Sequence, residues 1–147
     1  MPPRWIFQSG TAGKVAHVKS IQSIRVLFVV GGLYDGVLGL AFLLAGPAIY
    51  DHFNISPPNH PGYLQFPALL LLIFAWMFFA VAFNPSANRN LIFYGIFLKL
   101  SYSGIVFYYW MTSGVPAMWK PFAVIDLAFA ALFAWAIAAT RVAPSAG

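Results

Sequence analysis

The sequence predicts an all-α membrane protein, a four transmembrane helix bundle with its N and C termini cytoplasmic. Hydrophobic residues make up 61% of the 147 residues and charged residues only 7%, whereas soluble domains carry about a quarter charged residues. Four apolar segments occur along the chain, each close to the roughly 20 residues that cross a hydrocarbon core of about 30 Å. Outside these segments, Lys and Arg fall almost entirely on one side of the expected membrane.

The apolar segments define one bundle domain over residues 25–141, followed by a C-terminal tail, 142–147. Pro47 marks the end of the first segment, where its helix weakens. Pro67 stands in the first turn of the second segment, where proline costs a helix least. The expected spans are residues 26–49, 66–83, 91–111 and 121–140.

Residues 1–24 are expected to form a cytoplasmic N-terminal arm. They are not a secretory signal, because no long apolar segment follows Arg4. The apolar residues 5–7, together with Lys14 and Lys19, suit a position at the membrane surface. The motif SGTAG at 9–13 disfavours one continuous amphipathic helix in the arm.

The distribution of basic residues predicts the orientation. Cytoplasmic loops carry an excess of Lys and Arg, so the side with six of these residues is assigned to the cytoplasm and the side with one to the opposite face. This places the protein in the bacterial inner membrane as a multi-pass protein. The six are Arg4, Lys14, Lys19, Arg25, Arg89 and Arg141, and the one is Lys120.

Residue types that the chain lacks narrow its chemistry. The absence of cysteine excludes disulfides, cysteine-ligated zinc and iron–sulfur clusters within this chain. The three histidines, His17, His52 and His60, lie outside the expected spans, so none is placed to ligate a haem iron within the bundle. No cofactor is expected to be held by ligands of the chain itself, and contacts with quinone, pigment or lipid stay open.

Two binding classes receive little support. Asp51, His52 and His60 are of ligand types that suit zinc or copper, but their irregular spacing in a proline-rich loop favours solvated residues, and no metal site is predicted. The basic residues form no stripe with interleaved aromatics, which excludes nucleic acid as a partner. The expected partners are membrane lipids and other integral membrane subunits.

Three ionisable residues lie inside the expected spans: Asp35, Lys99 and Asp126. A charge at mid-bilayer costs roughly 2.5 to 3.5 kcal/mol, so each needs a partner or water. At 1.5 Å per residue, Asp35 and Lys99 lie about 15 and 14 Å from the cytoplasmic edge. We therefore predict a structural intramembrane ion pair between them. The alternative is a proton relay or a site at which Lys99 binds a substrate carboxylate.

Asp126 is expected to stand apart from this pair. Its depth is about 21 Å from the cytoplasmic edge, and its side chain leans toward the opposite surface, away from Lys99. Three possibilities stay open: a hydrogen bond from Tyr102 or a loop amide, protonation, or contact with a cation of a partner subunit.

Small residues accompany both members of the predicted pair. Gly32, Gly36 and Gly39 share a helix face with Asp35, and Gly95 lies one turn before Lys99. Glycines at such spacing allow close approach of another helix. We predict that these four glycines are helix-packing positions.

Four motifs carry a resemblance to a known group. They are YDGVLGLAFLLAG at 34–46, NPSANRN at 84–90, IFYGIFLKLSYSG at 92–104 and IDLAFAALFAW at 125–135. This pattern, over most of residues 25–140, resembles small uncharacterised bacterial four-helix membrane proteins grouped as DoxX-like. Named members of the group are linked to quinone-coupled sulfur oxidation, so the resemblance implies a quinone-linked oxidoreductase component. It assigns no catalytic residue to this chain.

The leading functional expectation is a non-catalytic accessory subunit that packs against the core of a larger energy-converting complex of photosynthesis or respiratory electron transport. The first alternative is a DoxX-like quinone-linked component, with the quinone ring near helix ends. The second is a small transporter with Lys99 and Asp35 as its polar gate. Four aromatic residues are candidates to flank the quinone: Trp76, Tyr108, Tyr109 and Trp110.

Overall fold

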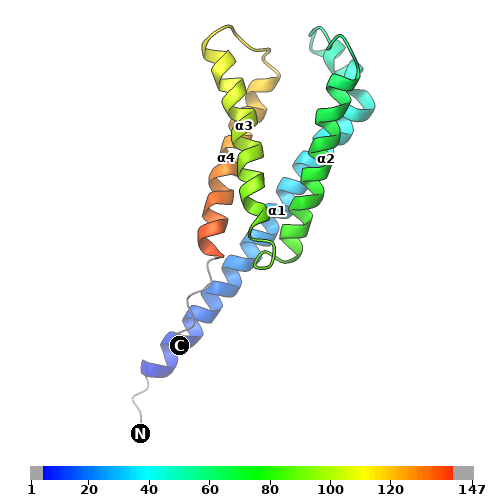
Figure 1. Cartoon of the computed structure of the whole chain (residues 1–147). Coiled ribbons are helices and arrows are strands. Elements are labelled where there is room, and N and C mark those ends of the chain that lie inside the picture. The colour runs from blue at the N-terminus through cyan, green and yellow to red at the C-terminus, as the bar shows by residue number, and fades with distance from the viewer. Residues whose placement is uncertain (1–4, 141–147) are drawn as a thin grey trace.

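The computed structural model contains four helices, each long and apolar enough to cross a membrane (Figure 1). It describes the backbone of residues 5–140 and the side chains of residues 18–140. Within residues 5–140 there are no strands, so the all-α prediction is confirmed for the described chain and the protein is a multi-pass membrane protein. The helices are α1 (Trp5–His52), α2 (Gly62–Phe83), α3 (Leu91–Met111) and α4 (Trp119–Ala139).

Three of the predicted spans agree with the helices to within a few residues, and α1 differs most. The part of α1 that is apolar enough to cross a membrane is Val18–His52, which exceeds the expected 26–49 at both ends. The helix runs without interruption through SGTAG, so the expectation that this motif breaks it is wrong. A glycine costs a helix only about 1 kcal/mol, which longer flanking helix can outweigh. The expected interfacial side chains at 5–7 and Lys14, with Arg4, Arg141 and the tail 142–147, lie outside the described side chains.

Pro47 bends α1 but does not end it. Ala45, two residues earlier, has φ −126° and ψ 15°, outside the helical region, and the helix then continues to His52. Proline removes one backbone donor and its ring clashes with the preceding turn, which produces a kink. The last two turns or so of α1, after Ala45, therefore run at an angle to the rest of the helix.

The helices form two hairpins. α1 packs mainly along α2 and α3 along α4, whereas the contacts between the hairpins are fewer. Figure 1 shows that the hairpins converge near the α2–α3 loop, residues 84–90, and separate toward the loops 53–61 and 112–118. We name these two ends of the bundle the closed end and the open end.

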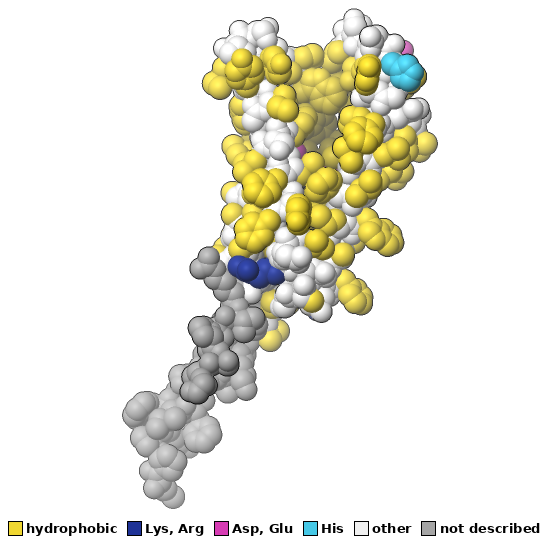
Figure 2. Space-filling model, viewed as in Figure 1, with side chains coloured by type: hydrophobic (Ala, Val, Ile, Leu, Met, Phe, Trp, Pro, Cys, Tyr) yellow, Lys and Arg dark blue, Asp and Glu magenta, His cyan; other side chains and the backbone are white. Residues whose placement is uncertain are grey.

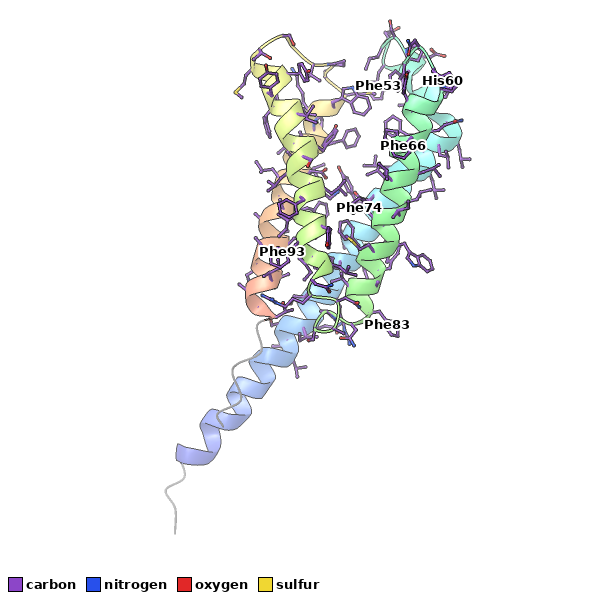
Figure 3. The ribbon with its side chains drawn as sticks, viewed as in Figure 1. Phe53, His60, Phe66, Phe74, Phe83 and Phe93 are labelled. Atoms are coloured by element: carbon purple, nitrogen blue, oxygen red, sulfur yellow. The ribbon has the colours of Figure 1, made fainter. Side chains whose placement is uncertain are left out.

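The closed end contains the hydrophobic core. Phe28 stacks on Phe133 with ring centroids 4.5 Å apart, and Phe78 lies 5.1 Å from Phe133. All three side chains have no exposed surface. Phe74 lies near the middle of α2, with its ring centroid 6.4 Å from that of Phe78, whereas Phe83 projects outward at the closed end (Figure 3). The aromatic core thus joins α1, α2 and α4 at this end.

Arg89, in the α2–α3 loop, connects this loop to the end of α4 by hydrogen bonds. Its guanidinium donates hydrogen bonds to the Ile137 carbonyl at 3.0 and 3.2 Å and to Thr140 Oγ1 at 3.2 Å. Carbonyls in the last turn of a helix lack helical partners, and a cation there also suits the helix dipole. This contact closes the narrow end of the bundle.

The predicted packing glycines lie at close helix approaches. A Cβ on Gly39 would be 2.8 Å from the carbonyl oxygen of Ala68 in α2, and a Cβ on Gly95 would be 2.6 Å from Cε1 of Phe78. Gly32 faces the Phe79 ring and Gly36 faces Ala75. Gly32, Gly36 and Gly39 therefore allow α1 to pack closely against α2. Gly95 of α3 leaves room for the ring of Phe78 from α2.

Candidate functional site

Three charged side chains from three helices meet in the middle of the bundle. Lys99 Nζ of α3 lies 2.5 Å from Asp35 Oδ1 of α1 and 3.0 Å from Asp126 Oδ1 of α4. Their exposed fractions are 0% for Asp35, 1% for Lys99 and 6% for Asp126. We name this group the ion triad; it links the two hairpins across their interface.

Asp35 and Lys99 lie together, as the depth estimate predicts. Lys99 Nζ donates a hydrogen bond to Asp35 Oδ1. Charge-assisted hydrogen bonds of this kind are stronger than neutral ones. The sequence expectation of a structural role for the pair is not decided by this proximity, because the same geometry also suits a binding site.

The expectation that Asp126 lies apart from Lys99 is wrong. Ser103 Oγ donates a hydrogen bond to the carbonyl of Ala123 at 2.8 Å, which fixes how α3 and α4 align. Because the two helices run in opposite directions, Asp126 then stands opposite residue 100, next to Lys99. Counting depth from the cytoplasmic edge therefore misplaced Asp126 by roughly 6 Å, about one helical turn.

Tyr102, which was considered as a hydrogen-bond donor to Asp126, bonds to another residue. The Tyr102 hydroxyl donates to the carbonyl of Trp119 at 3.2 Å, and so is not bonded to Asp126. With Lys99 at 3.0 Å, the charge of Asp126 has a cation within the chain. A cation on a partner subunit is therefore not required for this carboxylate.

Aromatic rings surround the ammonium group. Lys99 Nζ lies 5.0 Å from the centroid of Tyr34, 5.5 Å from that of Phe129 and 5.9 Å from that of Phe78. Cations within about 6 Å of a ring face are attracted by its electrons, more strongly where water is excluded. These rings compensate part of the cost of holding Lys99 without water.

A cavity of about 240 Å³ adjoins the ion triad and extends toward the open end. Figure 2 shows the corresponding hollow between the hairpins, with an acidic side chain visible at its base. All four helices contribute to its walls, and α2 contributes apolar residues only. Asp35 and Asp126 contribute the carboxylates. We name this space the cleft; its aromatic wall residues are Tyr34, Phe42, Tyr102, Trp119 and Phe122.

Several oxygens at the floor of the cleft lack hydrogen bonds. Among the described residues, Asp35 Oδ2, Asp126 Oδ1 and the Tyr34 hydroxyl are buried without a hydrogen-bond partner. Asp126 Oδ1 is within ion-pair distance of Lys99 but is not aligned for a hydrogen bond. Most buried polar groups in proteins have a partner, so these unsatisfied atoms are unusual and mark this side of the ion triad as a candidate site for a hydrogen-bonding ligand.

The aromatic residues expected to flank a quinone do not line the cleft. Trp76 is 79% exposed on α2, and Tyr108, Tyr109 and Trp110 are exposed on α3. At the open end, the His60 ring accepts a hydrogen bond from the Gly62 N–H at 3.0 Å, while Phe53 and His60 lie near the loop tips (Figure 3). The candidate aromatics and His60 are therefore separate from the ion triad. His52, expected in the loop, is instead the last residue of α1.

Sequence reasoning missed the aromatic walls, although a signal was present. Leu38 and Phe42 follow Asp35 by three and seven residues, and Phe122 and Trp119 precede Asp126 by four and seven. These spacings place each set on the helix face that carries the carboxylate. In α1 and α4, the acidic residue within the apolar span therefore marks the helix face that lines the cleft.

No protein-family model, curated protein or solved structure matches this chain. The resemblance to DoxX-like proteins therefore stays a prediction, and the functional argument depends on the geometry of the ion triad and the cleft.

Proposed function

We propose that the protein binds a small amphipathic molecule that enters the cleft from the bilayer. The observation that carries this proposal is the position of the ion triad at the base of the cleft. Ligand sites are usually apolar concavities with a few polar groups that fix the orientation of the ligand. Here the apolar walls suit the body of the molecule, and the carboxylates of Asp35 and Asp126, which line the cleft, suit its head group.

The cleft is blocked at the closed end. Toward the closed end, the packed rings of Phe28, Phe78 and Phe133 fill the space between the hairpins. A molecule bound at the ion triad would thus enter and leave through the open end or between the separated hairpins. This asymmetry supports a binding role. A transport cycle with Lys99 and Asp35 as its gate would require the aromatic core to part.

The DoxX-like resemblance suggests quinone as the bound molecule. In that case the chain is a quinone-linked component of the bacterial inner membrane, with the termini on the cytoplasmic side, and a quinone would be the co-purifying molecule. The basic residues Arg25 and Arg89, near the closed end, support this orientation under the positive-inside rule.

Membership of a larger membrane complex is a second proposal. Only 28 to 33% of the residues in the most apolar window of each span are buried within the chain. Large side chains project from the surface, including Trp76 at 79% and Phe83 at 87% exposure. Such surfaces suit lipids or neighbouring integral subunits, which supports an accessory subunit of an energy-converting complex.

Native mass spectrometry of the full chain, extracted in a mild detergent, tests the binding proposal. The wild type should carry a small-molecule adduct that extraction with organic solvent releases. Leu71→Trp, which fills the cleft, should remove the adduct, whereas Ile73→Trp, on the exposed side of the same helix, should retain it. An adduct that persists in Leu71→Trp, or its absence from the wild type, would contradict the proposal.

The same preparation tests the second proposal. An accessory subunit should migrate with other integral membrane proteins in native electrophoresis and form crosslinks to them in intact membranes. A single monodisperse species without crosslinked neighbours would contradict membership of a complex and leave the binding result unaffected.

A further inference from the structure

The charges at the floor of the cleft do not balance. The ion triad contains two carboxylates and one ammonium group. The other titratable side chains that line the cleft are Tyr34 and Tyr102, which carry no charge when protonated, and α2 contributes only apolar side chains. With both carboxylates ionised, the site therefore has a net charge of −1 within an apolar setting, where an uncompensated charge is costly.

The other basic side chains described at either end of the bundle are engaged elsewhere or lie at its edge. Lys120 Nζ is 4.6 Å from the Trp110 ring centroid, on the open-end side, and Arg89 is bonded to the end of α4. Among the described side chains, no Lys, Arg or His lines the cleft. The missing positive charge must then come from a proton or from a ligand.

The carboxylate oxygens of Asp35 and Asp126 also favour a cationic ligand. Asp35 and Asp126 both line the cleft. Asp35 Oδ2 is buried without a hydrogen-bond partner, and Asp126 Oδ1 has only its ion-pair contact with Lys99. Ionised carboxylates only accept hydrogen bonds, so the complementary group must be a donor. An ammonium group supplies both N–H donors and the positive charge.

The walls also suit a cation with an apolar body. Phe42 stacks on Trp119 with centroids 5.6 Å apart, and Trp119 itself lines the cleft. Aromatic faces attract organic cations, and the attraction grows when water is displaced. The volume of about 240 Å³ is sufficient for a small apolar group.

We infer that the cleft selects monocationic amphiphiles, with an ammonium head group on Asp35 and Asp126 and an apolar body between the two hairpins. This inference rests on the proposed binding function and names its ligand class. In the empty cleft one proton held by the two carboxylates balances the charge. Binding of the cation releases that proton to solvent, so the total charge of the site is the same before and after binding.

Two probes of matched size test the inference: 4-phenylbutylammonium, which is protonated at pH 7.5, and the neutral 4-phenylbutanol. We expect the purified full-length protein in detergent to bind the amine at least about tenfold more tightly than the alcohol, in keeping with one desolvated cation–π and charge contact. Calorimetry in buffers of different ionisation enthalpy should show that about one proton is released with each amine bound.

Asp126→Asn is the decisive variant, because it removes one negative charge while keeping the shape of the side chain. It should lose the preference for the amine and the proton release, and binding of the alcohol should be retained. Asp51→Asn, at an exposed aspartate outside the cleft, should behave as the wild type. A cooperative thermal transition for each variant establishes that it is folded.

Three results would overturn the inference. Equal affinity for amine and alcohol in the wild type would show that charge does not select the ligand. An unchanged amine preference in folded Asp126→Asn would show that this carboxylate does not hold the head group. Binding of neither probe, in a protein whose endogenous adduct is still lost in Leu71→Trp, would refute the cation class and leave the binding function intact.

Discussion

The packing between the two hairpins differs at the two ends of the bundle. At the closed end, Phe28, Phe78 and Phe133 interlock, and Arg89 ties the loop to α4. At the open end the hairpins separate, and a cavity of about 240 Å³ lies between them. The ion triad stands at the boundary between the two regions.

Because of this difference, the ion triad contacts packed aromatic rings on one side and the cleft on the other. Toward the closed end, aromatic rings enclose the ammonium group of Lys99. Toward the open end, the carboxylates of Asp35 and Asp126 border the cleft. A polar group whose only task is to join helices would need no cavity beside it, and the cavity therefore motivates the binding proposal.

The largest expected effect follows from removing the cation at the boundary. Lys99→Met leaves two carboxylates buried without their partner, and breaking a buried ion pair in this way costs about 3 to 5 kcal/mol. The folded fraction recovered by size-exclusion chromatography in detergent should fall sharply. Lys120→Met, which loses only a contact with Trp110 near the open end, should stay close to the wild type.

The rescue of Lys99→Met distinguishes a pair from a triad. Adding Asp35→Leu should recover part of the folded yield, because Asp126 still lacks its cation, and adding Asp126→Leu as well should recover more. Full recovery in the Lys99→Met/Asp35→Leu double variant would mean that Asp126 is not coupled to Lys99.

A second comparison sets the aromatic residues of the two ends against each other. Phe133→Ala creates a cavity in the packed closed end and should lower the free energy of unfolding by about 3 kcal/mol. Phe122→Ala enlarges a cleft that already exists, so its cost should be about 1 kcal/mol or less, by the same relation between cost and new cavity. Unfolding in a denaturing detergent measures both. Equal losses would contradict the distinction between the ends.

A third prediction concerns the approach of α1 to α2. Gly39→Ala would bring a methyl group to within 2.8 Å of the Ala68 carbonyl, and backbone cannot move aside easily. Overpacking of this kind costs about 1 to 3 kcal/mol. Gly104→Ala is the control, because its added methyl meets nothing within 4 Å and alanine favours a helix by about 1 kcal/mol. The thermal midpoints should move in opposite directions, and a matching loss in Gly104→Ala would contradict the account.

At the closed end, the smallest effect is expected from weakening the hydrogen bonds of Arg89. Arg89→Lys keeps the charge near the end of α4 but loses the forked pair of donors to the Ile137 carbonyl and Thr140. We expect a loss of about 1 kcal/mol, typical of a net hydrogen bond. Hydrogen exchange should be faster for the last turn of α4 and unchanged at the open end.

The sequence alone was sufficient for the four helices and for the proximity of Asp35 to Lys99. Apolar segments of spanning length, bounded by loops such as NPSANRN, define helices independently of tertiary contacts. Asp35 and Lys99 could be matched because both are counted from the same edge of the membrane. Gly32, Gly36, Gly39 and Gly95 were also recognisable as positions of close approach.

The position of Asp126 could not be predicted in this way, because it depends on the alignment of α3 and α4. That alignment is fixed by contacts such as the hydrogen bond from Ser103 to the Ala123 carbonyl, which no helix periodicity reveals. The cleft was missed for a related reason. Its existence depends on the separation of two hairpins, and apolar wall residues such as Phe42 look the same in sequence whether they face lipid, protein or a cavity.

The most direct test of the ion triad is a dipolar recoupling measurement by solid-state NMR on the protein in lipid bilayers, with ¹³C at the aspartate carboxyl carbons and ¹⁵N at the lysine ammonium groups. The chain has three acidic residues, all aspartates: Asp35, Asp51 and Asp126. We predict that two carboxyl signals, assigned to Asp35 and Asp126 by their loss in the asparagine variants, are strongly dephased by lysine nitrogen and that the signal of Asp51 is not. Dephasing of the Asp35 signal alone, or of neither buried carboxylate, would contradict the triad at the base of the cleft.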